Sequence, residues 1–148
     1  MSASRVTPVQ RVRSVAGDLV RRCRRPRVLR QAVKELAALP AGTVPDGQLL
    51  GKLSYGWGNF DYRAGTRYLA EAARQAMATA GPVLECGSGL STVMLGVMLG
   101  KLDRTLVSLE HLPPWRRRVA RVLKRHRIVA VDLREAPLRR YDGYDWYD

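Results

Sequence analysis

The spacing of apolar residues predicts two basic helices within residues 1–40. In residues 28–39 the apolar side chains recur three and four positions apart, which places them on one face of an amphipathic helix. A less regular pattern of the same kind covers residues 12–20. Pro26 is predicted to separate the two helices and Pro40 to end the second, because proline lacks the N–H that a helix requires.

Glycine and proline dominate the next stretch of the chain. Residues 41–59 therefore read as a connector between two parts of the protein. Helical spacing returns in residues 61–81, where Gly81 is predicted to end the helix. The predicted inward face of this helix consists of Tyr68, Leu69, Ala72, Ala73, Ala76 and Met77.

Short apolar runs then alternate with helical patterns. The predicted strands are residues 82–86, 105–110 and 127–133, and the predicted helices between them are residues 91–99 and 114–125. Such alternation indicates parallel strands joined by crossover helices. The predicted fold class is α/β, a partial Rossmann-like parallel sheet of three strands with preceding N-terminal helices.

Positive charge is concentrated in two blocks. Residues 1–40 and residues 111–140 each hold ten Lys/Arg and two Asp/Glu, a net charge of +8 for each block. Residues 41–110 are neutral, with six of each sign, and the last eight residues carry −3. Basic blocks attract nucleic acid or anionic lipid. Arginines nevertheless outnumber lysines 22 to 4, a skew that GC-rich coding also produces, so solvated basic faces are the favoured interpretation.

Several other kinds of protein do not fit this composition. The longest uncharged run near the middle of the chain, residues 86–100, is shorter than the roughly 20 residues of a membrane span. The N-terminus has no apolar segment of the kind that a secretory signal needs. Two cysteines and two histidines make neither a disulfide framework nor a spaced metal motif, so no metal is predicted. A cytoplasmic location is expected.

The sequence VLECGSGLST joins the first predicted strand of the sheet to the helix after it. A dinucleotide fold would place glycines at the positions of Gly87, Gly89 and Thr92, and a pyrophosphate would be repelled by Glu85. Glu110 follows Gly89 by 21 residues, near the roughly 20-residue spacing of an acid that binds ribose hydroxyls. The pattern favours a ligand with a ribose, no phosphate and cationic groups, which describes S-adenosylmethionine.

At this point the chain resembles the class I S-adenosylmethionine-dependent methyltransferases. Glu85-Cys86-Gly87-Ser88-Gly89 is similar to their first motif, E-x-G-x-G, and Ser91-Thr92 extends it in the form of one branch. Val107-Ser108-Leu109-Glu110-His111 is similar to their second motif, an acid that closes the second strand. The resemblance covers about residues 55–148.

The resemblance implies a set of cofactor-binding residues. Glu85 would help to hold the methionine ammonium, the glycines would let the cofactor lie against the backbone, and Glu110 would bind the ribose. Glu135 begins the segment that would border the adenine, with Asp132 as a rival. The predicted cofactor site comprises Glu85, Gly87, Ser88, Gly89, Ser91, Glu110, His111 and Glu135. Trp115 would be a core residue or a wall of the adenine pocket, and Trp57-Gly58-Asn59 would be a lid or a packing element.

The family's sheet has seven strands, whereas the third predicted strand of this chain is followed only by a short polar tail. Residues 60–148 are therefore expected to be the front half of a methyltransferase domain, a fragment or one half of a split protein, with a partner chain completing the sheet. Catalytic residues are unknown, because the strand that usually meets the substrate is not in this sequence. The methyl acceptor is likewise not identified.

Two other functions stay open. One is a noncatalytic protein that binds S-adenosylmethionine, and the other is a basic nucleic-acid-binding protein. The predicted nucleic-acid face is the side of residues 114–125 opposite Val119 and Val122, and it comprises Arg116, Arg117, Arg118, Arg121 and Arg125. No aromatic residues interleave with these arginines, so we expect only weak binding of RNA and duplex DNA that physiological salt abolishes.

Overall fold

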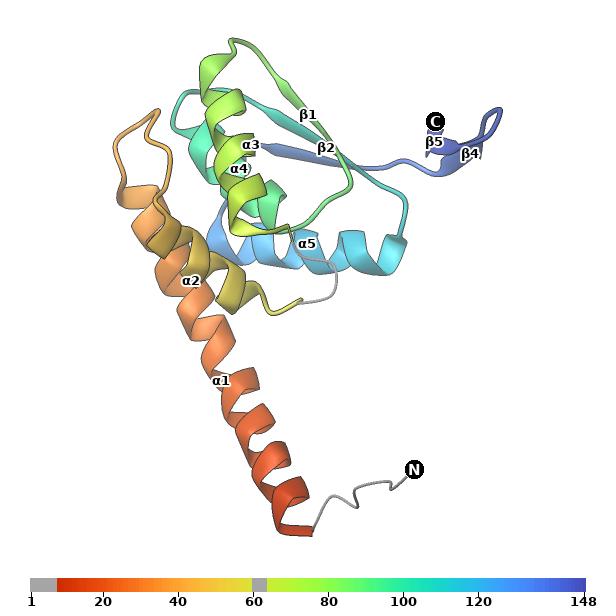
Figure 1. The fold of residues 1–148 in the computed structure, drawn as a ribbon. Coiled ribbons are helices and arrows are strands. Elements are labelled where there is room, and N and C mark those ends of the chain that lie inside the picture. The colour runs from red at the N-terminus through yellow and green to blue at the C-terminus, as the bar shows by residue number, and fades with distance from the viewer. Residues whose placement is uncertain (1–7, 60–63) are drawn as a thin grey trace.

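Helices precede a small parallel sheet, and a short hairpin follows it (Figure 1). A computed structural model describes residues 8–59 and 64–148, with side chains from residue 23 onward. The predicted α/β class is confirmed, with five helices and a three-stranded parallel sheet among these residues. The elements in chain order are α1 Pro8–Ala38, α2 Gly47–Trp57, α3 Thr66–Ala78, β1 Val83–Cys86, α4 Leu90–Gly100, β2 Leu106–Glu110, α5 Pro113–His126, β3 Val131–Glu135, β4 Leu138–Arg140 and β5 Asp145–Tyr147.

The predicted break at Pro26 is wrong, because α1 runs through this residue as one helix. A proline inside a helix costs about 3 kcal/mol through a lost hydrogen bond and a steric clash. Burial of the turns that follow offsets this cost, since Leu29, Ala32 and Leu36 are all less than 10% exposed. The helix ends at Ala38, shortly before Pro40, as predicted.

The connector predicted for residues 41–59 is also wrong, because it contains α2. The Asp46 side chain accepts a hydrogen bond from the Leu49 N–H at 2.7 Å and so caps the start of this helix. Gly58, in the left-handed conformation, ends it. A Cβ atom on Gly56 would lie 2.6 Å from the Leu29 backbone nitrogen, so this glycine lets α2 pack closely against α1.

Helix α3 confirms the helix predicted after the connector, although its inward face is narrower. Residues 61–63 of the predicted helix lie outside the described residues. Leu69, Ala73 and Ala76 are buried, whereas Tyr68 is 60% exposed. The helix ends at Ala78, before the predicted stop at Gly81, whose φ of 84° instead belongs to the turn that leads into β1.

The three long strands pair in the order β1-β2-β3, all parallel. Strand β3 begins four residues later than predicted, because Arg127 adopts the left-handed conformation that ends α5 and Val129 is 92% exposed. Helix α4 agrees with the prediction, and Gly96 explains its close packing. A Cβ atom there would lie 2.4 Å from the Val131 side chain.

The β4-β5 hairpin was not predicted. Its strands have three residues each and pair antiparallel, with Leu138 opposite Tyr147. Gly143 has a φ of 82° in the turn, and the Tyr141 and Tyr144 rings stack at 5.6 Å. Strands this short and this polar show no alternation of apolar and polar residues, which is the signal that a strand prediction needs.

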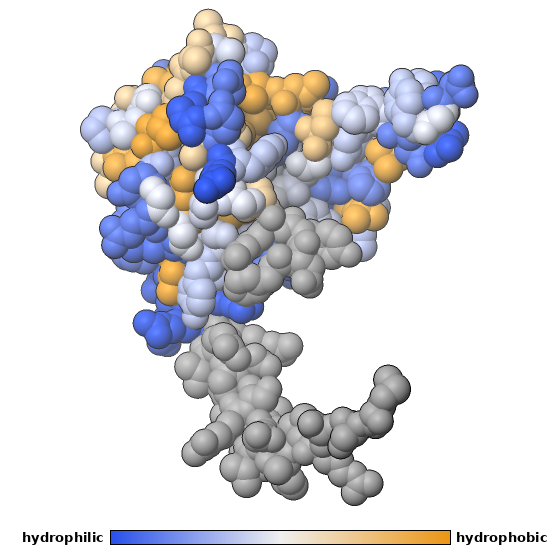
Figure 2. All heavy atoms as spheres, in the orientation of Figure 1, coloured by the Kyte–Doolittle hydropathy of each residue, from blue (hydrophilic) through white to orange (hydrophobic). Residues whose placement is uncertain are grey.

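The two faces of the sheet differ in burial. Side chains in a strand point alternately to opposite faces. Leu106 points to the face on which α4 and α5 pack and is fully buried, whereas Leu84 points to the other face and is 64% exposed. Apolar residues, drawn in orange, reach the surface beside β1 and β2 in Figure 2. Parallel sheets usually have both faces covered, so this open face is unusual.

The difference in burial between the two faces predicts that leucine-to-alanine substitutions on them lower the free energy of unfolding by different amounts. Leu106→Ala leaves a cavity in the core and should lower the free energy of unfolding by about 2–5 kcal/mol. Leu84→Ala should change it by about 0.5 kcal/mol or less, because its side chain is already in water. Urea denaturation of dilute protein measures both. Similar large losses for the two variants would show that the outer face is covered in solution.

Candidate functional site

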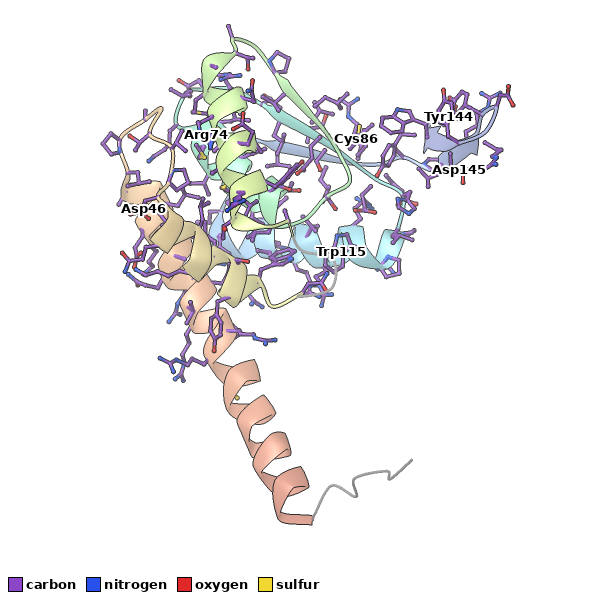
Figure 3. All side chains as sticks on the ribbon, in the orientation of Figure 1. Asp46, Arg74, Cys86, Trp115, Tyr144 and Asp145 are labelled. Carbon is purple, nitrogen blue, oxygen red and sulfur yellow. The ribbon has the colours of Figure 1, made fainter. Side chains whose placement is uncertain are left out.

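A cavity of about 790 Å³ opens at the carboxyl ends of β1 and β2. This is the edge of a parallel sheet at which ligands usually bind. Its walls come from the turn after β1, the end of β2, both ends of the α2–α3 connection, the start of α5 and the hairpin. The lining residues are Trp57, Asn59, Ala64, Tyr68, Gly87, Ser88, Gly89, Leu90, Ser91, Glu110, His111, Leu112, Trp115 and Tyr147. Figure 3 shows Trp115 on α5 and Cys86 at the end of β1.

The turn after β1 depends on glycine. Gly87 has a φ of 92°, a conformation that other residues rarely adopt, and its N–H donates to the Leu109 carbonyl at 2.9 Å. The Gly89 N–H donates to the Thr92 hydroxyl at 2.7 Å, which satisfies a donor at the start of α4. The turn therefore presents its backbone to the cavity without large side chains.

Glu110 connects this turn to β2. Its Oε2 accepts hydrogen bonds from the Ser88 N–H at 3.0 Å and the Ser88 hydroxyl at 2.7 Å, and its Oε1 accepts one from the Leu112 N–H at 2.9 Å. The residue is 3% exposed. Glu110 is therefore not a solvated acid, although it stands at the end of a strand. The buried carboxylate is held because three donors satisfy it.

Aromatic rings form one wall of the cavity. Trp57 and Trp115 meet edge to face with ring centroids 5.9 Å apart, and the Trp115 indole N–H donates to the Ser88 carbonyl at 2.7 Å. The same turn is thus held from β2 by Glu110 and from α5 by Trp115. Residues 57–59 were predicted to be a lid or a packing element. Trp57 is 5% exposed, so it packs in the core, and it also lines the cavity.

Arg118 supports this wall from behind. Its guanidinium lies 5.3 Å from the Trp57 ring centroid and 4.8 Å from that of Trp115, and it donates to the Trp57 carbonyl at 3.2 Å. Arg116 forms an ion pair with Glu135 at 3.3 Å. The prediction that the α5 arginines form one free face is therefore wrong for these two residues.

His111 and Tyr147 also line the cavity. Their rings lie 6.0 Å apart, and the His111 Nδ1 is 3.6 Å from Glu110 Oε1. Burial, and then the negative charge of Glu110, raise the pKa of the Tyr147 phenol. Sequence reasoning missed Tyr147, because it reaches the cavity only through the hairpin, which has no sequence signature.

Glu85 does not line the cavity. Its Oε2 accepts hydrogen bonds from the Thr92 hydroxyl at 2.5 Å and the Ser108 hydroxyl at 2.7 Å. Burial raises the pKa of the Glu85 carboxyl, and the hydroxyls around it oppose that rise only in part. The structure thus gives the first acid of the motif a partly buried position, linked to the turn through Thr92.

The structure brings six of the eight predicted site residues to one cavity and leaves out two acids. Gly87, Ser88, Gly89, Ser91, Glu110 and His111 line it together. Glu85 is linked to the turn through Thr92, and Glu135 is exposed at the end of β3 beside Arg116. Asp132, the rival of Glu135, pairs with Arg134 at 2.5 Å and also lies outside the cavity.

Comparison with known proteins gives no relatives. No protein-family model, no curated protein and no solved structure matches the chain. Among the described residues, no helix is both long and apolar enough to cross a membrane. The function must therefore be argued from the cavity.

The hydrogen bonds of Glu110 predict that its charge stabilises the fold. Glu110→Gln replaces one acceptor oxygen with an amide group that cannot accept the Ser88 or Leu112 N–H. This substitution should cost about 1–3 kcal/mol of unfolding free energy. Glu135→Gln is the matched control, because Glu135 pairs in register with Glu110 on the neighbouring strand but is exposed. Equal melting temperatures for the two variants would contradict this assignment.

The raised pKa of Glu85 predicts a pH-dependent stability. The native state holds this proton more tightly than the unfolded state, so stability is lost as pH rises through the ordinary glutamate pKa of 4.5 toward the raised value. Glu85→Gln keeps an acceptor for Thr92 and Ser108 but never ionises. Its melting temperature relative to the natural protein should therefore increase between pH 4.5 and pH 8. A difference that does not change with pH would show that the carboxyl is not perturbed.

Proposed function

We propose that the cavity binds S-adenosylmethionine and that the protein transfers its methyl group to an acceptor. The observation that carries the proposal is the Glu110 carboxylate, which lines the cavity while it is hydrogen-bonded to the glycine turn of the preceding strand. This arrangement supports the resemblance of both sequence motifs to those of class I methyltransferases. A Rossmann-like character of the sheet is part of the same proposal.

The cavity has the polarity that such a ligand needs. A carboxylate beside the turn disfavours a pyrophosphate but accepts hydrogen bonds from two ribose hydroxyls. The Ser88 hydroxyl donates to Glu110 Oε2 at 2.7 Å, and a ribose hydroxyl would take over this interaction. The rings of Trp57, Trp115 and Tyr147 offer apolar surface for an adenine and π faces for a sulfonium cation. The volume of about 790 Å³ lies within the range of small-molecule sites.

The cofactor would supply a methyl group already activated on a sulfonium sulfur. The acceptor's electron pair would form the new bond to this carbon as the carbon–sulfur pair returns to sulfur, and the acceptor would lose its proton. The residues described here bind and orient the cofactor. Glu85 enters the proposal as a group that holds the turn through Thr92, and no residue is assigned as a general base. A partner chain that completes the sheet belongs to the proposal as well.

The proposal predicts a preference for S-adenosylmethionine or S-adenosylhomocysteine over NAD. In a Trp146→Phe variant, tryptophan fluorescence comes only from Trp57 and Trp115, which line the cavity. Each of the two ligands should quench this fluorescence and bind in calorimetry at least about tenfold more tightly than NAD. Glu110→Gln should weaken binding by about tenfold or more, because hydrogen bonds to a charged group are worth about 1.5–3 kcal/mol.

Glu135→Gln controls for this loss, since Glu135 lies outside the cavity. Its affinity should stay within about twofold of that of the natural protein. Circular dichroism must first show that Glu110→Gln is folded at the temperature of titration. Equal or tighter binding of NAD, or no binding of either ligand, would contradict the proposal.

A further inference from the structure

A second cavity, of about 260 Å³, lies where α1, the end of α2 and α5 meet. Trp57 borders both this cavity and the larger one. The cavity is strongly basic. Its lining includes Arg25, Arg118, Arg125 and the imidazole of His126, and none of the described residues that line it is acidic.

Two of the guanidinium groups contact aromatic rings and backbone carbonyls. Arg118 is fixed by the rings of Trp57 and Trp115 and by the Trp57 carbonyl. Arg25 lies 5.9 Å from the Tyr55 ring centroid and donates to the Gly58 carbonyl at 3.4 Å. Both cations are thus oriented before any ligand binds, which lowers the entropy cost of binding an anion.

The local field at this cavity is positive. The pKa of His126 is lowered first by burial and then by the charges of Arg125 and Arg30. Arg125 itself is exposed and forms no ion pair among the described residues. An anion in the cavity would relieve this repulsion and would stabilise the protonated form of His126.

We infer that this cavity is a binding site for a phosphate group, held by Arg118 and Arg125 with His126 at its side. Guanidinium groups present forked pairs of donors that match phosphate oxygens. Several cations around one small cavity suit a doubly charged tetrahedral oxyanion better than a single carboxylate. The inference does not rest on the cofactor assignment, because none of the cationic residues of this cavity lines the larger one, although both cavities are bordered by Trp57.

The two histidines of the chain allow a direct test. His126 lines the basic cavity, whereas His111 lines the larger one and serves as an internal control. Inorganic phosphate, titrated at pH 7.5 against sodium chloride of equal ionic strength, should shift the ring NMR signals of His126 saturably and leave those of His111 nearly unchanged. Sodium sulfate, whose charge is constant across the pH range, should raise the His126 pKa relative to chloride. Equal responses to chloride would overturn the inference.

Two variants of α5 distinguish phosphate binding at this cavity from a general effect of the protein's net charge. Arg125→Gln should weaken phosphate binding about fivefold or more without disturbing the fold, since this side chain is exposed. Arg117→Gln removes the same charge from the same helix, but Arg117 does not line the cavity, so its affinity should stay within about twofold. Similar losses for the two variants would show that only net charge matters, and the site would be rejected.

A short single-stranded RNA then distinguishes the sources of the phosphate. RNA binding that is tighter than phosphate binding and depends on Arg125 would identify a nucleic-acid backbone as the ligand. Equal or weaker RNA binding, with phosphate binding retained, would identify free phosphate or a small phosphate ester. RNA binding that Arg125→Gln and Arg117→Gln weaken equally would argue against the site.

Discussion

The candidate site depends on one buried carboxylate. Glu110 stands at the end of β2 and accepts two hydrogen bonds from Ser88, so the turn after β1 is attached to the neighbouring strand. Such bonds to a charged group are each worth about 1.5–3 kcal/mol, and a buried carboxylate without them would be costly. The Trp115 indole N–H holds the same turn at the Ser88 carbonyl from α5. The cavity is therefore bordered by a hydrogen-bonded backbone turn, a buried acid and an aromatic wall, and this is the arrangement on which the proposed cofactor site depends.

The two acids of the motifs occupy different positions in this structure. Glu110 lines the cavity, whereas Glu85 does not and is linked to the turn through the Thr92 hydroxyl, which in turn accepts the Gly89 N–H. The sequence motifs place both acids at strand ends and do not show which of the two lines the cavity. In the structure Glu85 has internal partners, because the hydroxyls of Thr92 and Ser108 donate to it.

The sequence predicted best those elements whose apolar pattern is strong and local. Strands β1 and β2 and helices α4 and α5 agree with the prediction to within one or two residues. Helix α2 was missed because its glycines resemble a connector. Close packing against Leu29 explains Gly56, whereas Gly47 and Gly51 have open space around them. The continuity of α1 through Pro26 depends on burial against α2, which is tertiary information. The strands of the hairpin are too short to show an alternation of apolar and polar residues. The sequence therefore did not predict that the hairpin places Tyr147 at the cavity.

The arginines of α5 lie in different environments, which the composition of the chain does not reveal. Arg118 is part of the aromatic wall, Arg116 pairs with Glu135, and Arg125 borders a separate cavity. Trp57 is common to both cavities, so the wall of the proposed cofactor site is also a wall of the basic one. Positive charge on α5 is therefore partly structural, and the part that borders the basic cavity is the part for which an anion is proposed, so the arginines do not form one uniform solvated face.

A crystal structure with S-adenosylhomocysteine tests the central claim most directly. The account predicts that the ribose hydroxyls lie within about 3 Å of the Glu110 carboxylate oxygens, as expected for hydrogen bonds to a charged acceptor. The Ser88 hydroxyl should have turned away, and the adenine should lie against the aromatic wall. A ligand bound elsewhere, or one whose ribose does not contact Glu110, would contradict it.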